Sequence, residues 1–141
     1  MKSKKQSYLM ILKFIIVSPI TYFMIIPGLI LHLSISIYHL FVFKILNIPY
    51  VSSTEYFVYD RKFLSKLNFF EKLNCYYCSY YNNLFAYCVE IAARTERFWC
   101  PIKYEHSLLH KHSQYIKFLS TQDGKELREK WENLRKFSEI K

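Results

Sequence analysis

A long apolar stretch near the N-terminus constrains this 141-residue chain more than any other feature. From Tyr8 to Ile48 the only charged side chains are those of Lys13 and Lys44. As one straight helix these 41 residues would be about 60 Å long, roughly twice the thickness of a bilayer's hydrocarbon core. The stretch therefore predicts a membrane segment, and its length is enough for two crossings.

The dipeptide Pro27-Gly28 is the strongest helix-breaking signal inside the stretch. A division there leaves apolar segments at about 8–26 and 29–47, each close to the roughly 20 residues that one crossing needs. We therefore expect residues 1–48 to form a transmembrane helical hairpin, with the lipid bilayer as its partner. Two alternatives stay open, namely one crossing followed by an interfacial helix, and a cleaved signal peptide. Against the signal peptide, Lys13 interrupts the apolar core and no cleavage motif follows.

The basic residues predict the orientation in the membrane. Residues 1–48 contain five lysines and no acid, and the lysines at positions 2, 4 and 5 are expected to hold the N-terminus in the cytoplasm. Two crossings would return the rest of the chain to that side, whereas one crossing would export it. Four basic residues soon after the second segment favour the cytoplasmic return: Arg61, Lys62, Lys66 and Lys72.

The remainder of the chain predicts a small helical domain. Two glycines and four prolines are too few for a β-rich domain with many tight turns, so we expect a mainly α fold. Residues 49–59 are expected to be a linker and 60–141 the domain. The pattern predicts four helices: one from an N-cap at Asp60 to a break at Asn82–Asn83, one from there to Trp99, a third over 105–120, and a fourth over 121–137.

Two cysteines spaced as C-x2-C, Cys75 and Cys78, suggest a metal clip. In a reducing compartment this spacing is more often metal-binding or redox-active than a structural disulfide. If the helices on either side of Asn82 form an antiparallel pair, Cys88 faces the clip, and an extended chain after Cys100 lets His106 reach it. Zinc or an iron–sulfur cluster is then the expected cofactor. The alternative is that these thiols are small apolar fillers among packed tyrosines.

From Pro27 to Lys103 the chain resembles an uncharacterised family of small bacterial membrane proteins. The pattern that carries the resemblance is an aspartate–arginine pair, an N-C-x-Y-C clip, an E-I-A-x-R-T-E helix and a W-C-P-I-K segment. It matches Asp60, Arg61, Asn74, Cys75, Cys78, Asn82, Glu90, Arg94, Thr95, Glu96, Trp99, Cys100, Pro101 and Lys103.

The resemblance implies an inner (plasma) membrane protein of a bacterium, and it supplies no activity. Cys88 is not part of the family pattern, and this favours a metal site of Cys75, Cys78 and Cys100. We expect His106 as the fourth ligand, with Cys88 as the alternative.

These features favour a non-enzymatic accessory or assembly module whose cytoplasmic domain contacts a protein partner. Glu90, Arg94 and Glu96 are expected to form a buried ion network, because their spacing does not put both acids on one helix face. One alternative is an electron-transfer or enzyme subunit with an iron–sulfur centre. Another is a membrane-tethered nucleic-acid binder that stacks bases on the tyrosines around the clip, but the net charge of +4 after position 48 is too mild to favour it. The sequence predicts no oligomeric state.

Overall fold

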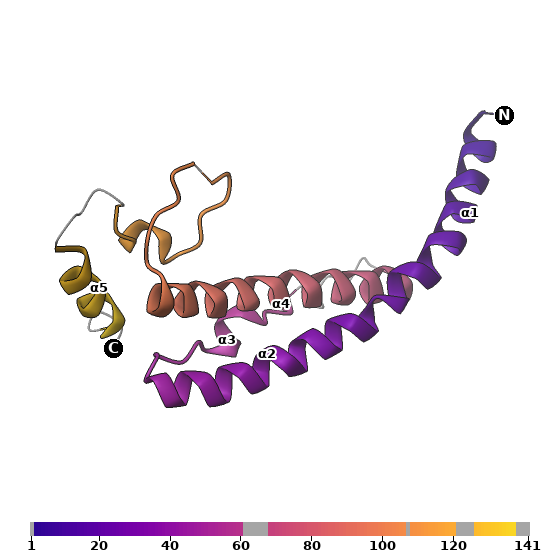
Figure 1. Cartoon of the computed structure of the whole chain (residues 1–141). Helices are drawn as coiled ribbons and strands as arrows, with labels where there is room; N and C mark the ends of the chain where they lie inside the picture. Colours follow the sequence, from indigo (N-terminus) through magenta and orange to yellow (C-terminus); the bar gives the residue numbers. More distant parts are fainter. Residues whose placement is uncertain (1, 61–67, 107, 121–125, 138–141) are drawn as a thin grey trace. The chain divides into compact units, whose positions relative to one another are not determined.

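The computed structural model describes residues 2–60, 68–106, 108–120 and 126–137 (Figure 1). Within these ranges the chain is mainly helical and contains no strand, which confirms the expected fold class. The elements in order are α1 (Lys2–Phe23), α2 (Ile25–Leu46), α3 (Ser53–Tyr56), α4 (Phe69–Trp99), the 3₁₀ helix η2 (Tyr115–Lys117) and α5 (Leu127–Arg135).

The apolar stretch forms one bent helix. Its helical path is interrupted only at Met24, and Leu12–Leu46 is long and apolar enough to cross a membrane. The break expected at Pro27-Gly28 is absent, because Pro27 lies in the first turn of α2, where a backbone N–H has no helical partner to lose. The amide of Gly28 donates to the carbonyl of Met24 at 3.2 Å, so the helical path runs through. The structure therefore does not show the expected hairpin.

The chain divides into two compact units, residues 1–36 and residues 37–141, here called the anchor unit and the body. In the anchor unit, large apolar side chains such as Ile15, Ile20 and Phe23 are more than half exposed. Its hydroxyl groups bond within the helix, as Ser18 Oγ does to the carbonyl of Phe14 at 2.6 Å and Ser34 Oγ to that of Ile30 at 2.8 Å. The described helix surface is thus largely apolar, with Lys13 as an exposed charge, and these hydroxyl groups need no water.

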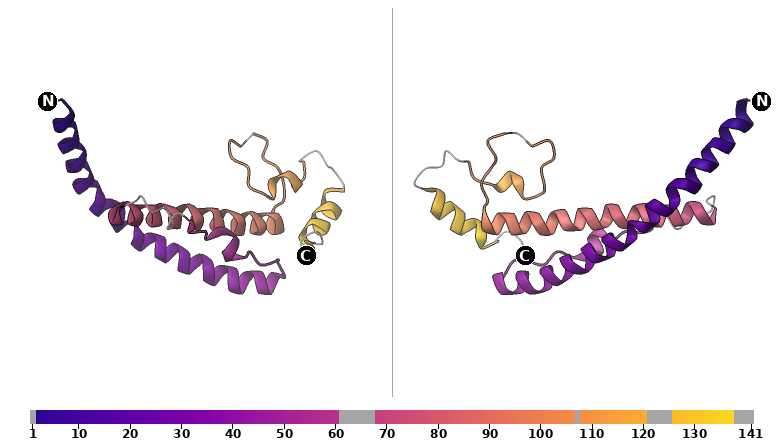
Figure 2. Two further views of the ribbon diagram at one scale, coloured as in Figure 1. Left: turned by 180° about the vertical axis from the view of Figure 1, so that it is seen from behind. Right: turned by 45° about the vertical axis from the view of Figure 1, so that its right-hand side comes forward.

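The body is organised around α4, which lies beside the last turns of α2 (Figures 1 and 2). The expected break at Asn82–Asn83 is wrong, since α4 is continuous over 31 residues. Asn82 Nδ2 donates to the carbonyl of Cys78 at 2.8 Å, and Asn83 Nδ2 reaches the carbonyl of Val58 at 3.0 Å. Both amides therefore bond without interrupting the helix. The buried apolar core comprises Phe43, Ile48, Val51, Leu84, Tyr87, Ile91, Ala93, Tyr115, Phe118 and Phe137.

Part of the predicted first helix is present, since residues 69–82 belong to α4. The backbone N–H of Asn68 donates to Glu71 Oε2 at 2.7 Å, which fixes the start of α4 at Phe69. Asp60 precedes residues 61–67, and the predicted helix over them, with Arg61, lies outside the described residues. The expected linker over 49–59 contains the short helix α3.

The third predicted helix, over 105–120, is also wrong. Its described residues form turns and η2, and Leu119 near its end pairs with the residues just before the segment. Leu119 N–H donates to the carbonyl of Pro101 at 2.7 Å, and Lys103 N–H to that of Leu119 at 2.8 Å. A closed loop over 101–120 results. The fourth predicted helix, over 121–137, is present as α5, while its first residues, 121–125, lie outside the described residues.

Candidate functional site

The structure does not bring the predicted metal ligands together. Cys75 and Cys78 lie one turn apart on α4, and Cys100 caps the opposite end of the same helix. Because α4 is continuous, Cys78 and Cys100 are about 33 Å apart along its axis, and Cys78 and Cys88 about 15 Å. His106 lies exposed in the 101–120 loop.

As the structure places them, these donors do not share one centre, whereas a zinc ion or an iron–sulfur cluster needs its ligands within a few ångströms of one centre. Metal binding by this chain stays a prediction. Among the residues that the structure describes, no three His, Cys, Asp or Glu side chains form a group that could hold a metal ion. Burial also raises the pKa of the Cys88 thiol, which disfavours the thiolate that binds metals. The prediction depended on an antiparallel pair of helices on either side of Asn82, and the structure has the single helix α4 there.

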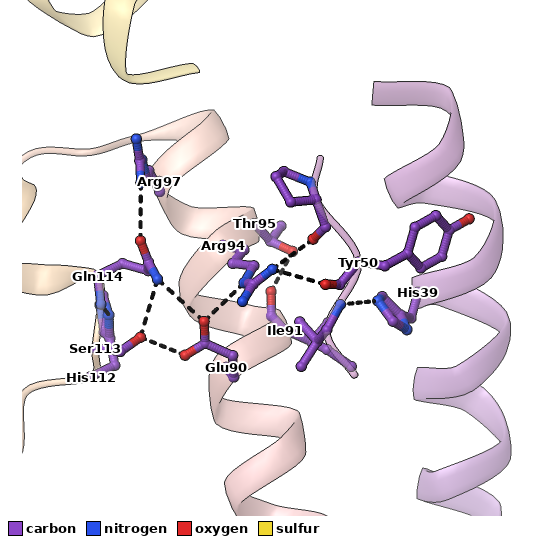
Figure 3. A network of polar contacts seen from close by, with 12 residues as sticks. His39, Tyr50, Glu90, Ile91, Arg94, Thr95, Arg97, His112, Ser113 and Gln114 are labelled. Atoms are coloured by element: carbon purple, nitrogen blue, oxygen red, sulfur yellow. Dashed lines mark hydrogen bonds and ion pairs between the residues drawn. The ribbon is translucent and has the colours of Figure 1, made fainter. Parts of the chain in front are cut away.

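The densest polar cluster of the body surrounds Glu90, on the inward side of α4 (Figure 3). Glu90 is only 7% exposed, and its Oε1 accepts a hydrogen bond from Arg94 Nε at 2.8 Å. Gln114 Nε2 also donates to Oε1, at 3.2 Å, and Ser113 Oγ donates to Oε2. Both carboxylate oxygens are therefore engaged, and the expectation of a buried ion network is confirmed for Glu90 and Arg94.

The charge of Glu90 is compensated where it lies. Burial would raise the pKa of its carboxyl, but hydrogen bonds from Ser113 and Arg94, with the charge of Arg94, outweigh this and leave the pKa lowered. A carboxylate held ionised and saturated by donors is poorly suited to general acid–base catalysis, which needs a pKa near the working pH. This arrangement is suited to holding segments together.

Arg94 connects α4 to the chain that follows α2. Its Nη1 donates to the carbonyl of Pro49 at 2.8 Å and to that of Tyr50 at 3.1 Å. The guanidinium thus satisfies two carbonyls that have no helical partner, while it pairs with Glu90. The Arg94 side chain therefore links α4 to the segment that follows α2 and, through Glu90, to the 101–120 loop.

Arg97 extends the network towards the C-terminus. It is fully buried, and its Nη1 donates to Gln114 Oε1 at 3.1 Å while its Nε donates to the carbonyl of Leu134 at 3.1 Å. The guanidinium also lies 4.4 Å from the centre of the Phe137 ring. From α5, Arg135 Nε donates in return to the carbonyl of Phe98 at 2.9 Å. These contacts attach the end of α5 to α4.

His39 fastens α2 to the rest of the body. It is 5% exposed, and the backbone N–H of Val51 donates to its Nε2 at 3.1 Å. The hydroxyl of Tyr87 lies 2.9 Å from its Nδ1, so both ring nitrogens have partners. The His32–His39 spacing predicts a shared polar helix face, and the structure shows that His39 contacts α4.

Glu96 lies apart from this network. His112 Nε2 lies 3.0 Å from its Oε2, close enough for an ion pair but without the geometry of a hydrogen bond. The Tyr104 hydroxyl donates to its Oε1 at 3.1 Å. Of the other motif residues, Asn74 is exposed on α4, Trp99 is 56% exposed at the end of α4, and Lys103 is exposed in the loop. The motif therefore does not converge on one site.

Sequence reasoning missed Ser113, Gln114 and Arg97. The one signal for Arg97 is its position three residues after Arg94, which puts both on the side of α4 that carries Glu90. Ser113 and Gln114 carry no such signal, because their contacts depend on the loop that folds back over α4.

Comparison of the chain with family models, with curated proteins and with solved structures gives no match in any of the three. The resemblance to a family of small bacterial membrane proteins therefore stays a prediction.

Proposed function

We propose that this chain is a membrane-anchored, non-enzymatic adaptor whose body binds a protein partner. Two features support the anchoring. The most apolar 18-residue window of Leu12–Leu46 has a mean hydropathy of 2.2, and only 6% of that window is buried inside the protein. A soluble protein normally covers such a helix, so a lipid bilayer is the natural environment for this one.

The observation that carries the adaptor function is the 101–120 loop. Its side chains include Leu109, which is 98% exposed, and Ile116, which is 83% exposed. The network around Glu90 fastens the loop to α4 through Ser113 and Gln114. A loop that is fixed at its base and presents apolar side chains to water is typical of a docking surface, because little entropy remains to be lost on binding.

The loop also has a polar rim that fits a partner with acidic groups. An open hollow of about 420 Å³ beside Ile116 is lined by Lys103, Tyr104, Glu105, Lys111 and Tyr115. The rings of Tyr104 and Tyr115 are stacked, with their centres 6.4 Å apart, and Lys111 Nζ lies 5.8 Å from the centre of the Tyr115 ring. Aromatic groups with lysines around an apolar centre are a common composition for protein interfaces.

The side of the membrane is part of the proposal. Basic residues near the N-terminus and after the apolar helix favour a cytoplasmic body, which requires the chain to return through the bilayer as a hairpin. A bacterial inner membrane is the setting implied by the motif resemblance. An impermeant thiol reagent applied to intact cells should leave Cys100 unmodified; modification of Cys100 in intact cells would instead indicate one crossing and an exported body.

Purification of the full chain from its native membranes tests the adaptor function. We expect one protein to copurify in fixed ratio with the unaltered chain, and to be lost when Leu109 and Ile116 are both changed to aspartate. The matched control is Val58→Asp, because Val58 is 52% exposed elsewhere on the body. Retention of the same protein by the loop variant, or loss of it in the control, would contradict the proposal.

A further inference from the structure

We propose that one side of the body lies in the interface of the bilayer that anchors the chain. The side chains concerned, here called the apolar flank, are Phe41 and Ile45 of α2 and Phe85, Val89, Ala92 and Trp99 of α4. The inference rests on the proposed membrane anchoring and adds that α4 is itself a lipid-contacting helix.

The α2 half of the flank is located by a contact between the two helices. Tyr38 OH donates to Thr95 Oγ1 at 3.1 Å, which marks one side of the α2–α4 pair. Phe41 and Ile45 lie three and seven residues after Tyr38, so they share its side of α2. They are 64% and 74% exposed.

The α4 half lies next to the same contact. Ala92 and Trp99 lie three residues before and four residues after Thr95, and Ala92 is exposed. Phe85 and Val89 continue the row at the same helical spacing, and both are 53% exposed. The exposed side of α4 from Phe85 to Trp99 is therefore a mainly apolar stripe, and it meets the exposed side of α2 near the Tyr38–Thr95 contact.

On α4 the stripe carries one charged side chain, Glu96, which lies between Ala92 and Trp99 in the same helical row and is 30% exposed. It is engaged by the loop, since His112 Nε2 lies 3.0 Å from it and the Tyr104 hydroxyl donates to it.

Between Lys72 and Glu96 the only charged residues of α4 are Glu90 and Arg94. Glu90 is buried and Arg94 donates to backbone carbonyls of the segment after α2, so both belong to the inward side. A helix whose outer side faced water would be expected to show most of its charges there, whereas α4 turns Glu90 and Arg94 inward.

Continuity with the anchoring helix identifies the occupant as lipid. Two members of the flank, Phe41 and Ile45, belong to Leu12–Leu46, the helix that is long and apolar enough to cross a membrane. Trp99 lies at the end of the stripe, and tryptophan prefers the boundary between lipid and water. Glu71 and Lys72 near the start of α4 need water, so the helix is expected to lie along the interface and not across the bilayer.

Tryptophan fluorescence tests this, since the chain has only Trp99 and Trp131. The Trp131→Phe chain, reconstituted in phosphatidylcholine–phosphatidylglycerol vesicles, leaves Trp99 as the one reporter. Brominated acyl chains should cause a severalfold loss of its emission, and aqueous iodide should have little effect. The control replaces both tryptophans with phenylalanine and carries Glu129→Trp on the exposed side of α5. Its emission should be quenched by aqueous iodide and little affected by brominated acyl chains. Vesicle flotation is measured in parallel.

Each outcome decides the matter. Protein that floats with the vesicles while Trp99 is quenched by iodide and not by brominated lipid would overturn the inference and leave the anchoring intact. Trp99 shielded from both quenchers would mean that a second copy or another protein covers the flank, which also overturns it. Protein that does not float would overturn the proposed anchoring, and the inference with it.

Discussion

The two sides of α4 have opposite chemistry, and the arrangement is the reverse of that in a water-soluble helix. The inward side holds Glu90 and Arg97, which are 7% and 0% exposed. The outward side carries Phe85, Val89 and Trp99, each more than half exposed. Charges stay inside because each has matched donors or acceptors, and apolar groups stay outside because the proposed surroundings there are lipid. The inward side determines the fold of the body, and the outward side determines where the body lies.

The largest effect is expected from removing the central charge of the inward side. Glu90→Ala leaves Arg94 without its ion-pair partner and Ser113 and Gln114 without their acceptor. We expect a loss of about 3–5 kcal/mol in the free energy of unfolding, as is usual when one partner of a buried pair is deleted. Denaturant unfolding of the full chain in micelles, followed by circular dichroism, measures it. The matched control is Glu126→Ala, whose exposed pair with Lys130 should contribute less than about 1 kcal/mol; equal losses in the two variants would contradict this account of the inward side.

The next effect concerns the attachment of α5. Arg97→Met keeps the length and apolar stem of the side chain but removes its donors to Gln114 and to the carbonyl of Leu134. Each buried acceptor left unsatisfied costs about 1–3 kcal/mol. We expect faster amide hydrogen exchange over 127–135 than in the unaltered chain, with the middle of α4 unchanged. Unchanged protection of α5 would mean that Arg97 does not attach it.

The pH dependence of stability provides a third, smaller effect. Because the pKa of Glu90 is lowered in the folded protein, its stabilisation is fully present above the ordinary value of 4.5. It is lost as the pH falls through the lower, folded value. We expect Glu90→Gln to reduce the dependence of unfolding free energy on pH in this acid range. The same acid dependence in both proteins would show that Glu90 is not the group responsible.

The smallest effect on folding is expected from the outward side. Val89→Ser changes a side chain that is more than half exposed, so the unfolding free energy in micelles should shift by no more than about 0.5 kcal/mol. The same change should weaken the contact of α4 with lipid, seen as a smaller loss of Trp99 emission in brominated vesicles. A large loss of stability in micelles would mean that Val89 belongs to the core.

The fold class could be predicted because it depends on composition and on local pattern. Few glycines and prolines and an apolar stretch of 41 residues leave little besides helices. The local pattern could not decide whether the helix breaks at Asn82–Asn83. An asparagine pair ends a helix in some proteins, and in others its side chains form hydrogen bonds along a continuous helix. Here the side-chain amide of Asn82 donates to the carbonyl of Cys78, and that of Asn83 donates to the carbonyl of Val58. The helix therefore continues, and the cysteines predicted to meet at the metal site lie apart along it.

The candidate site was predictable only where it is local. The spacing of Glu90 and Arg94 predicts their ion pair directly. The loop that supplies Ser113 and Gln114 was predicted to be helical, because its apolar residues recur at nearly helical spacing. Tyr115 and Phe118 pack into the core and Gln114 bonds to α4, and these tertiary contacts outweigh the local preference.

Extraction of native membranes at alkaline pH tests the membrane anchoring, on which the account depends, most directly. We predict that the full chain stays in the membrane pellet and is released only by detergent, since only 6% of the most apolar window of Leu12–Leu46 is buried inside the protein. Release into the supernatant as a monodisperse, detergent-free protein would contradict the account, because that helix would then have to be covered by protein and not by lipid.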